Sequence, residues 1–425
     1  MNGDSSTKQI DDFFRYYRHP TWLQIGPFGP LLRPYVEMLL SEGYRHRTIV
    51  RYIGALAHFN SWAADRRIPI SEIDHDLTEK FVVTHLPHCR CPRPQYRSAR
   101  EVIPALRHAV RLLEERGLAA PRLEVVTPIA AEVARFRHFL LDSSGLAEST
   151  CKYECRWVYR FLDRHFSKKP VDLSQITPKM VDSWILELSR TYQNSLKLVR
   201  TSLRSYFRFR AAQGHDDTRS LAASLPSLPR PSTALIRTMS DAQLQTLLKS
   251  FDLHTAEGLR DHAMVRCLSD LGLRAKEVIQ LSLDDINWSA GTIIIRKTKG
   301  RHPRSLPLPK ATGRAIAGYL KSGHPALSNR RLFSRMRAPL NRPLTEAGVR
   351  HVMQRALNGC GLADDFSGTH VLRRTLATKL QRRGVSVKAI ADVLGHLNLQ
   401  TTMRYAGVDF ERLRRLSLPW VGRMP

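Results

Sequence analysis

Apolar residues recur at helical spacing from Leu31 onward. They return at steps of three and four instead of alternating as they do in a half-buried strand, and this period is typical of amphipathic helices. The first two groups are Leu32, Tyr35, Val36, Leu39 and Leu40, and then Ile49, Tyr52, Ile53, Leu56 and Phe59. The first part of the chain is therefore predicted to be helical.

A similar pattern returns after the breaker-rich stretch VVTPIA, and several landmarks of the first segment have counterparts in the second. The pairs are Leu39-Leu40 with Leu140-Leu141, Gly43 with Gly145, Thr48 with Thr150, Phe59 with Phe161, and Ile73 with Ile176. We interpret them as a divergent internal duplication of a small helical module. The alternative is that two unrelated helical segments share common residue types.

A stripe of cations lies near the end of the second segment, between Ser195 and Gly214. A helix here would place its basic residues on one face and its apolar residues on the other. The basic residues are Lys197, Arg200, Arg204 and Arg208, and the apolar ones are Val199, Leu203, Tyr206 and Phe207. Such a face is suited to phosphates, although many basic stripes are only solvated surface.

The stretch from Gly214 to Ile236 is rich in Ser, Pro and Asp and has no periodicity, which predicts a linker. Ser240 then has the character of a helix N-cap. Strand signals follow at Gly291 to Arg296 and Arg304 to Leu308, around the basic turn KTKGRHP. We predict a two- or three-stranded sheet inside a mostly helical domain.

These patterns predict a mainly α chain of several domains. The boundaries are 1–120 for an N-terminal helical module, 125–215 for a second helical module, 216–238 for the linker, 239–415 for the last domain and 416–425 for a tail. The length of 425 residues agrees, because single cores usually stop growing at roughly 250–300 residues.

Charge narrows the choice of partner. Lys and Arg number 67 against 38 Asp and Glu, which gives a formal charge of +29. A polyanion is the expected partner. The chain lacks an apolar run long enough to span a membrane, and Met1 to Arg18 do not resemble a secretory signal, so we expect no membrane partner and a cytoplasmic location.

Cysteine usage is sparse, with six residues in the whole chain, and no structural disulfide is expected. One cluster, His85, His88, Cys89 and Cys91, invites a metal interpretation. Its spacing is not a recognised zinc pattern, and no second Cys/His pair follows it. We therefore favour a loop with free thiols and predict no metal, while a zinc site stays an open alternative.

Three motifs in the last domain occur in a fixed order. They are GLRAKEVIQL with Arg274 and Glu277, GTHVLRRTLATKL with His370 and Arg373, and LGHLNLQTTMRYAGV with His396 and Tyr405. With the basic turn, they resemble the catalytic domain of the tyrosine recombinase, or phage integrase, family. The resemblance covers about Met239 to Arg415. The preceding helical unit resembles that family's core-binding domain, a SAM-like helical fold.

The resemblance implies a role for each motif residue. Arg274, Arg373 and His396 would bind the scissile phosphate, His370 would act as a base, and Tyr405 would be the nucleophile. Glu277 would brace the site. Lys299, beside Gly300 in the turn, matches the catalytic lysine, and Lys297 is the alternative because the turn is one residue longer than is common. Lys276 departs from the family, which more often has a small residue there.

The chemistry of phosphodiester cleavage agrees with these residue types. In-line attack builds negative charge on the non-bridging oxygens, which guanidinium groups grip bidentately. A phenol with a pKa near 10 requires an acceptor or a cationic field to become a nucleophile. The leaving 5′ oxygen requires a proton. Because a 3′-phosphotyrosine keeps the bond energy, we predict no cofactor, neither ATP nor metal.

The sequence thus predicts a DNA strand transferase that serves a bacterial mobile element by integration or transposition. Its modules would clamp duplex DNA in the cytoplasm, at the nucleoid, and accessory recombinases or DNA-bending proteins are possible partners. The apolar segment after Tyr405, with Leu413, Leu416, Leu418 and Trp420, would join four subunits on paired sites or dock on its own domain. The rival functions are a type IB topoisomerase and a DNA-binding regulator without cleavage.

Overall fold

The computed structural model describes the chain from Gly26 to His396, apart from 92–95, 120–126, 168, 193–194, 216, 226–236, 297–302, 326–329 and 341. Two compact units are present, one comprising Met1–Ala120 with Leu235–Pro425, the other Pro121–Ala234. The described elements are mostly helices with one small antiparallel sheet, which confirms the predicted fold class. None of the described helices is long and apolar enough to cross a membrane.

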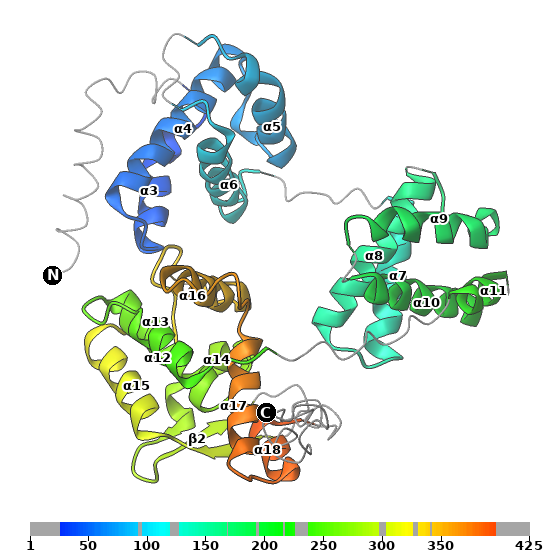
Figure 1. Cartoon of the computed structure of the whole chain (residues 1–425). Coiled ribbons are helices and arrows are strands. Elements are labelled where there is room, and N and C mark those ends of the chain that lie inside the picture. Colours follow the sequence, from blue (N-terminus) through cyan, green and yellow to red (C-terminus); the bar gives the residue numbers. More distant parts are fainter. Residues whose placement is uncertain are drawn as a thin grey trace, which may run out of the picture. The chain divides into compact units, whose positions relative to one another are not determined.

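The N-terminal module is a bundle of helices around its own apolar core (Figure 1). The fully buried rings of Tyr35, Phe59 and Phe81 lie at the centre. The helical periodicity from Leu31 is therefore confirmed as one buried face. The elements are η1 (Gly29–Leu31), α3 (Leu32–Ser41), α4 (His46–Asp65), η2 (Ile70–Glu72), α5 (His75–Lys80), η3 (Phe81–His85), η4 (Leu86–His88) and α6 (Ala99–Glu115).

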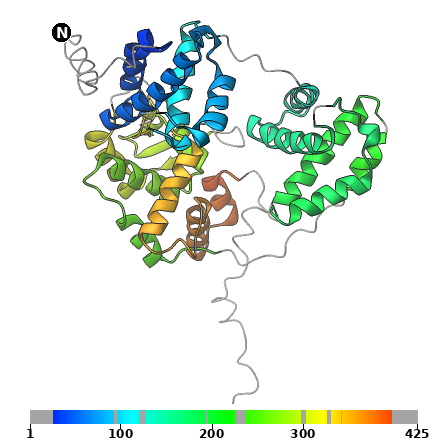
Figure 2. The ribbon, with the colours of Figure 1, turned by 90° about the horizontal axis from the view of Figure 1, so that it is seen from above.

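The second module, drawn in teal to green in Figure 2, forms a separate bundle. The carboxylate of Glu132 is buried in its core, accepts a 2.8 Å hydrogen bond from the Tyr206 hydroxyl and lies 3.4 Å from the Arg210 guanidinium. The charge is thus paired, as burial requires. The elements are α7 (Pro128–Asp142), α8 (Glu148–Phe166), η5 (Leu173–Gln175), α9 (Pro178–Ser189), α10 (Leu196–Ala212) and α11 (Asp217–Ser224).

The two modules repeat the same order of elements. Each has two long helices, a 3₁₀ turn and two more helices, if the short elements η1, η3 and η4 of the first module and the last helix, α11, of the second are set aside. Gly43 and Gly145 both follow the first long helix with positive φ, 79° and 57°. Phe59 and Phe161 are both fully buried in the second. The residue pairs found in the sequence thus occupy matching positions.

The predicted linker differs from the structure over its first half. Residues Asp217–Ser224 form α11, and Leu221 and Leu225 are only 3% and 2% exposed in the core of the second module. The Thr218 hydroxyl also donates to the Phe207 carbonyl at 3.0 Å. The stretch as a whole has no apolar period. The few apolar residues that pack this one short helix against the module therefore do not predict it.

The last domain combines helices with a three-stranded antiparallel sheet in the order β1-β2-β3. In the sheet, Ile293 pairs with Leu306 and Ile295 with Arg304, close to the predicted strands. The elements are α12 (Asp241–Lys249), α13 (Ala256–Asp270), α14 (Ala275–Gln280), η7 (Leu283–Asp285), β1 (Ile286–Asn287), β2 (Thr292–Ile295), β3 (Arg304–Pro307), α15 (Lys310–Ser322), α16 (Glu346–Gly359), α17 (His370–Arg382) and α18 (Val387–Leu394).

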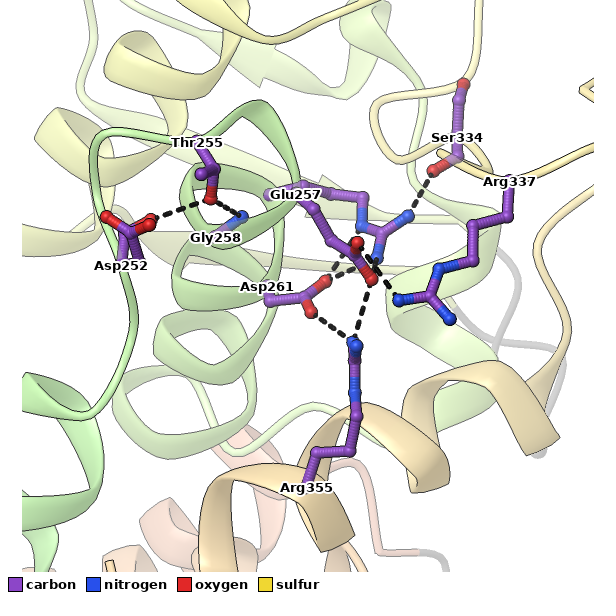
Figure 3. Close-up of polar contacts among 9 residues, drawn as sticks. Asp252, Thr255, Glu257, Gly258, Asp261, Ser334, Arg337 and Arg355 are labelled. Carbon is purple, nitrogen blue, oxygen red and sulfur yellow. Dashed lines mark hydrogen bonds and ion pairs between the residues drawn. The ribbon is translucent and has the colours of Figure 1, made fainter. Parts of the chain in front are cut away.

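Helix α12 begins as predicted, with Ser240 and Gln243 in a reciprocal capping box. Helix α13 is central and packs against α12, α14, α15, α16 and α17. Figure 3 shows how polar contacts fix it: Arg355 of α16 lies 3.0 Å from Glu257 and 2.8 Å from Asp261. Arg260 also donates to the Ser334 carbonyl at 3.2 Å. This anchored helix leads directly into the Gly272–Arg274 turn.

Candidate active site

Arg274 is fixed by the carboxylate three residues after it. It stands immediately before α14, where its backbone N–H donates to Glu277 Oε2 at 2.9 Å and its Nη1 to Glu277 Oε1 at 2.7 Å. A carboxylate in the first turn of a helix can reach back to the residue preceding that helix. The spacing in G-L-R-x-x-E is therefore the spacing that lets Glu277 hold both the backbone and the side chain of Arg274.

A second arginine, Arg304 on β3, approaches Glu277 from the sheet. Its Nη2 lies 2.9 Å from Glu277 Oε2, and its Nε donates to the Val393 carbonyl at 3.1 Å. Glu277 is 2% exposed. Burial would raise the pKa of Glu277, but hydrogen bonds and charge from Arg304, then Arg274, outweigh it, so the pKa is lowered. Glu277 is thus a charged brace between two cations.

The sequence motifs did not single out Arg304, although strand alternation contains a signal for it. Side chains two apart on a strand share a face, so Arg304 lies on the side of Leu306, which is buried. A basic residue on the buried face of a strand requires an acidic partner. In the structure that partner is Glu277, the acidic residue of the first motif.

Arg373, on α17, joins the two turns that carry the other motif residues. It is 3% exposed, and its Nη1 donates to the Gly272 carbonyl at 2.5 Å. Its Nη2 donates to the Leu394 carbonyl, next to the L-G-H glycine. His370 is the first residue of the same helix, and a spacing of three places His370 and Arg373 on one face.

The backbone conformation and close packing at position 395 explain why a glycine precedes His396. Gly395 ends α18 in the left-handed region, with φ 63°, and its carbonyl accepts from Arg274 Nη2 at 3.0 Å. A Cβ at this position would lie 2.7 Å from Arg304 Nη1. Glycine therefore satisfies both the backbone conformation and the close approach of a guanidinium.

Desolvation and neighbouring cations lower the pKa of both histidines. For His396, partial burial is the larger cause, Arg373, Arg274 and Arg304 add to it, and the pKa falls to about 4. For His370, partial desolvation again comes first, followed by repulsion from Arg373, Arg374 and Arg274. Both rings are thus neutral at pH 7, and the three arginines outweigh the single charge of Glu277. The site is built for an anion.

The structure brings Arg274, Glu277, Arg373 and His396 together, with His370 within the field of the same arginines. The remaining candidates lie outside the described residues. They are Tyr405, Lys299 and its alternative Lys297.

The predicted stripe on α10 is only partly open to a ligand. Lys197 and Arg208 are exposed, whereas Arg200 and Arg204 are partly buried. The Arg204 guanidinium donates to the Leu225 carbonyl, just after α11. The helix that the linker prediction missed therefore engages the centre of the stripe.

Comparison with known proteins places this site in a family. Residues 237–412 match the model of the phage integrase family. The chain is 34% identical over 402 residues to y4rA of Sinorhizobium fredii (strain NBRC 101917 / NGR234), which bears the name of an integrase/recombinase; the match covers 93% of this chain and 95% of y4rA. Tyrosine recombinase XerD of Yersinia pestis is 30% identical over 293 residues, 67% of this chain and 95% of XerD.

The fold is also similar to that of a solved recombinase structure. The solved structure of XerH site-specific recombinase, bound to a palindromic difH substrate, aligns with a TM-score of 0.52 and 18% identity over 70% of this chain and 98% of that one. The similarity to y4rA over 93% of this chain agrees with it, as does the family match, which spans the arginine cluster of Arg274, Arg304 and Arg373. The chain belongs to the phage integrase family and is a tyrosine recombinase, an enzyme that cleaves and rejoins DNA.

Proposed function

We propose that this recombinase integrates or transposes a mobile DNA element by site-specific strand exchange, with Tyr405 as the nucleophile. The observation that carries the assignment of the site is the arrangement around Glu277. Arg274 is held by that carboxylate and by the Gly395 carbonyl, while Arg373 joins the turns beside them. A rigid cationic site of this kind is matched to a phosphate whose charge increases during reaction.

In the proposed mechanism, Arg274 and Arg373 stabilise the non-bridging oxygens of the scissile phosphate. Tyr405 attacks phosphorus, the bond to the 5′ oxygen breaks, and a 3′-phosphotyrosine forms. Neutral His370 takes the phenolic proton, and His396 donates a hydrogen bond to the phosphate. Lys299 delivers a proton to the departing 5′ oxygen. Religation reverses these steps with a new 5′ hydroxyl as the attacking group.

The N-terminal module supports a role in integration. The match to XerD covers 95% of XerD but only 67% of this chain. The match to y4rA covers 93% of this chain. The chain therefore shares with y4rA a length beyond that of XerD. We propose that the modules at 1–120 and 125–215 are duplicates that both bind duplex DNA, the first at accessory sequences or as an extension of the clamp.

We further propose that four subunits assemble on paired sites. The supporting feature is the apolar character of the segment after Tyr405, where Leu413, Leu416 and Trp420 stand among arginines. This segment lies outside the described residues. In the family such a segment docks on a neighbouring subunit, and accessory recombinases or DNA-bending proteins would act on the same assembly.

The test is recombination on the DNA that flanks the gene. A plasmid carrying both flanks would be placed with the chain in a recombination-deficient host, and new junctions would be sequenced. We expect junctions at one fixed position, dependent on Tyr405 and lost in Tyr405→Phe. Relaxation of supercoils without new junctions would instead favour a topoisomerase, and DNA binding without cleavage would favour a regulator.

A further inference from the structure

Four potential metal ligands meet in the N-terminal module, away from the arginine cluster. They are His58, His85, Cys89 and Cys91, and their ligand atoms all lie within 4.8 Å of one another. His58 comes from α4, His85 ends η3, and the two cysteines follow η4. His88, which the sequence pattern had grouped with them, is exposed and is not part of the cluster.

The ligand missing from the sequence pattern is therefore His58, 27 residues before His85. A search for a Cys/His pair after Cys91 could not find it, because the fourth group precedes the others and lies on a different helix. Folding of α4 against η3 and η4 brings it into place. The preference for a loop with free thiols rested on that absent pair.

Three of the distances within the cluster match those of a tetrahedral coordination sphere. The Nε2 atoms of His58 and His85 are 3.3 Å apart, and the Cys89 and Cys91 sulfurs lie 3.3 and 3.4 Å from His58 and His85. Around zinc, bond lengths of about 2.0 Å to nitrogen and about 2.3 Å to sulfur give ligand separations of about 3.3 Å and about 3.5 Å.

Hydrogen bonding outside the cluster fixes the orientation of His58. Its Nδ1 lies 3.0 Å from the Tyr96 carbonyl, which can only accept, so the neutral ring carries its proton on Nδ1. The Nε2 lone pair then points at the His85 nitrogen and the Cys89 sulfur. Metal-binding histidines commonly have such a carbonyl partner on the second nitrogen.

The surroundings also suit a closed metal site. Cys89 and His58 are buried, and the backbone N–H of Cys91 donates to the Cys89 sulfur at 3.4 Å. Phe81 stacks on His85 at a centroid distance of 5.0 Å and meets His58 edge-on at 5.2 Å. These contacts fix both imidazoles beside the two sulfurs.

We propose that His58, His85, Cys89 and Cys91 bind one Zn²⁺ ion in the N-terminal module. Two thiolates and two imidazoles are a donor set that zinc prefers, and four protein ligands leave no open position for a substrate. The ion is therefore structural. It ties the chain after η4 to α4 and is separate from the strand-transfer chemistry.

The test is the zinc content of untagged, full-length protein, purified under reducing conditions without chelator. We expect about one zinc per chain in the parent protein, and less than about a tenth of that in the double variant Cys89→Ser/Cys91→Ser. His88→Ala and Cys360→Ser are the matched controls. Each removes a potential ligand outside the cluster and should retain the full zinc content.

Cobalt substitution of the parent protein keeps the test decisive if the double variant misfolds. We expect the metal-depleted chain to take up one Co²⁺ and to show the strong visible bands of tetrahedral cobalt with thiolate charge transfer. Weak octahedral absorption, a zinc content near zero after incubation with Zn²⁺, or the same zinc content in parent and double variant would overturn the proposal.

Discussion

At the scale of single residues, Gly395 and Arg304 explain part of the L-G-H motif. Arg304 lies against the space where a side chain at position 395 would begin, and the Gly395 carbonyl holds Arg274. Any side chain there would push one guanidinium away from Glu277 and disturb the turn that positions the other. A substitution at position 395 should therefore displace the phosphate-binding groups as well as change the stability of the fold.

Gly395→Ala should therefore lower the rate of DNA cleavage by at least about tenfold, because small displacements of positioned groups are costly in catalysis. The matched control is Gly384→Ala. Gly384 also has positive φ, 80°, but a Cβ there meets nothing within 4 Å. Both variants place an alanine at positive φ, so single-turnover cleavage at equal DNA occupancy tests the contact with Arg304. Equal rates in the two variants would show that the approach of Arg304 is unimportant.

The leaving-group role is tested with a substrate whose bridging 5′ oxygen is replaced by sulfur. Sulfur departs without a proton, so a general acid becomes dispensable. Lys299→Ala should be slower by about a hundredfold or more on normal DNA and nearly restored on the sulfur substrate. Arg274→Ala should stay slow on both, because its target is the non-bridging oxygens. Rescue of Lys297→Ala in place of Lys299→Ala would exchange the two assignments.

Local spacing encodes how Glu277 holds Arg274, three residues before it. Arg373 is instead held by carbonyls far away in sequence, those of Gly272 and Leu394. The sequence motifs nevertheless selected Arg274, Glu277, Arg373 and His396 as candidates. They did not reveal Arg304 or His58. Each of these acts through a partner far away in sequence, Glu277 for Arg304 and His85 for His58. Only the packing of separate elements brings such pairs together, so no short pattern contains them.

At the scale of elements, long periodic helices and the hairpin followed from the sequence, whereas the short helix α11 did not. This helix has too few apolar residues to show a helical period in the sequence. The error affected the interpretation of α10, since Leu225 accepts from Arg204 in the middle of the basic stripe. Lys197 and Arg208, near the two ends, are exposed. They are the residues we expect to reach phosphates.

Lys197→Ala/Arg208→Ala should reduce the salt dependence of DNA binding by up to about two units of slope, because each lost phosphate contact removes about 0.9. Lys179→Ala/Arg190→Ala removes the same charge from exposed positions on and just after α9 and should change the slope less. Titrations over a range of salt concentrations would measure both. Equal slopes in the two double variants would leave the stripe as solvated surface.

At the scale of the whole molecule, the described residues contain three large apolar cores, one in each helical module and one in the last domain. Repeated landmarks in the sequence indicated the two modules, and the composition break near Pro226 indicated a boundary. No comparable signal indicates how subunits assemble, since the segment that would join them is recognised only by its apolar residues.

Deletion of the chain from Arg412 onward should preserve binding to a single site and abolish the pairing of two sites. The deletion removes Leu413, Leu416, Leu418 and Trp420 but leaves Tyr405 and the described arginine cluster in place. Native gels with one or two sites per fragment would separate single-site from paired complexes. Unimpaired pairing would contradict the docking of this segment on a neighbouring subunit, and weaker single-site binding would indicate docking on its own domain.

Trapping on a nicked suicide substrate would show whether Tyr405 becomes covalently joined to DNA. Loss of the short 5′ fragment prevents religation, so the covalent complex should accumulate and survive denaturation. Digestion and mass spectrometry should place the nucleotide on Tyr405. Tyr405→Phe should bind the same DNA with equal affinity and yield no adduct, since only the phenolic oxygen is lost. An adduct in Tyr405→Phe, or one mapped to another residue, would show that Tyr405 is not the nucleophile.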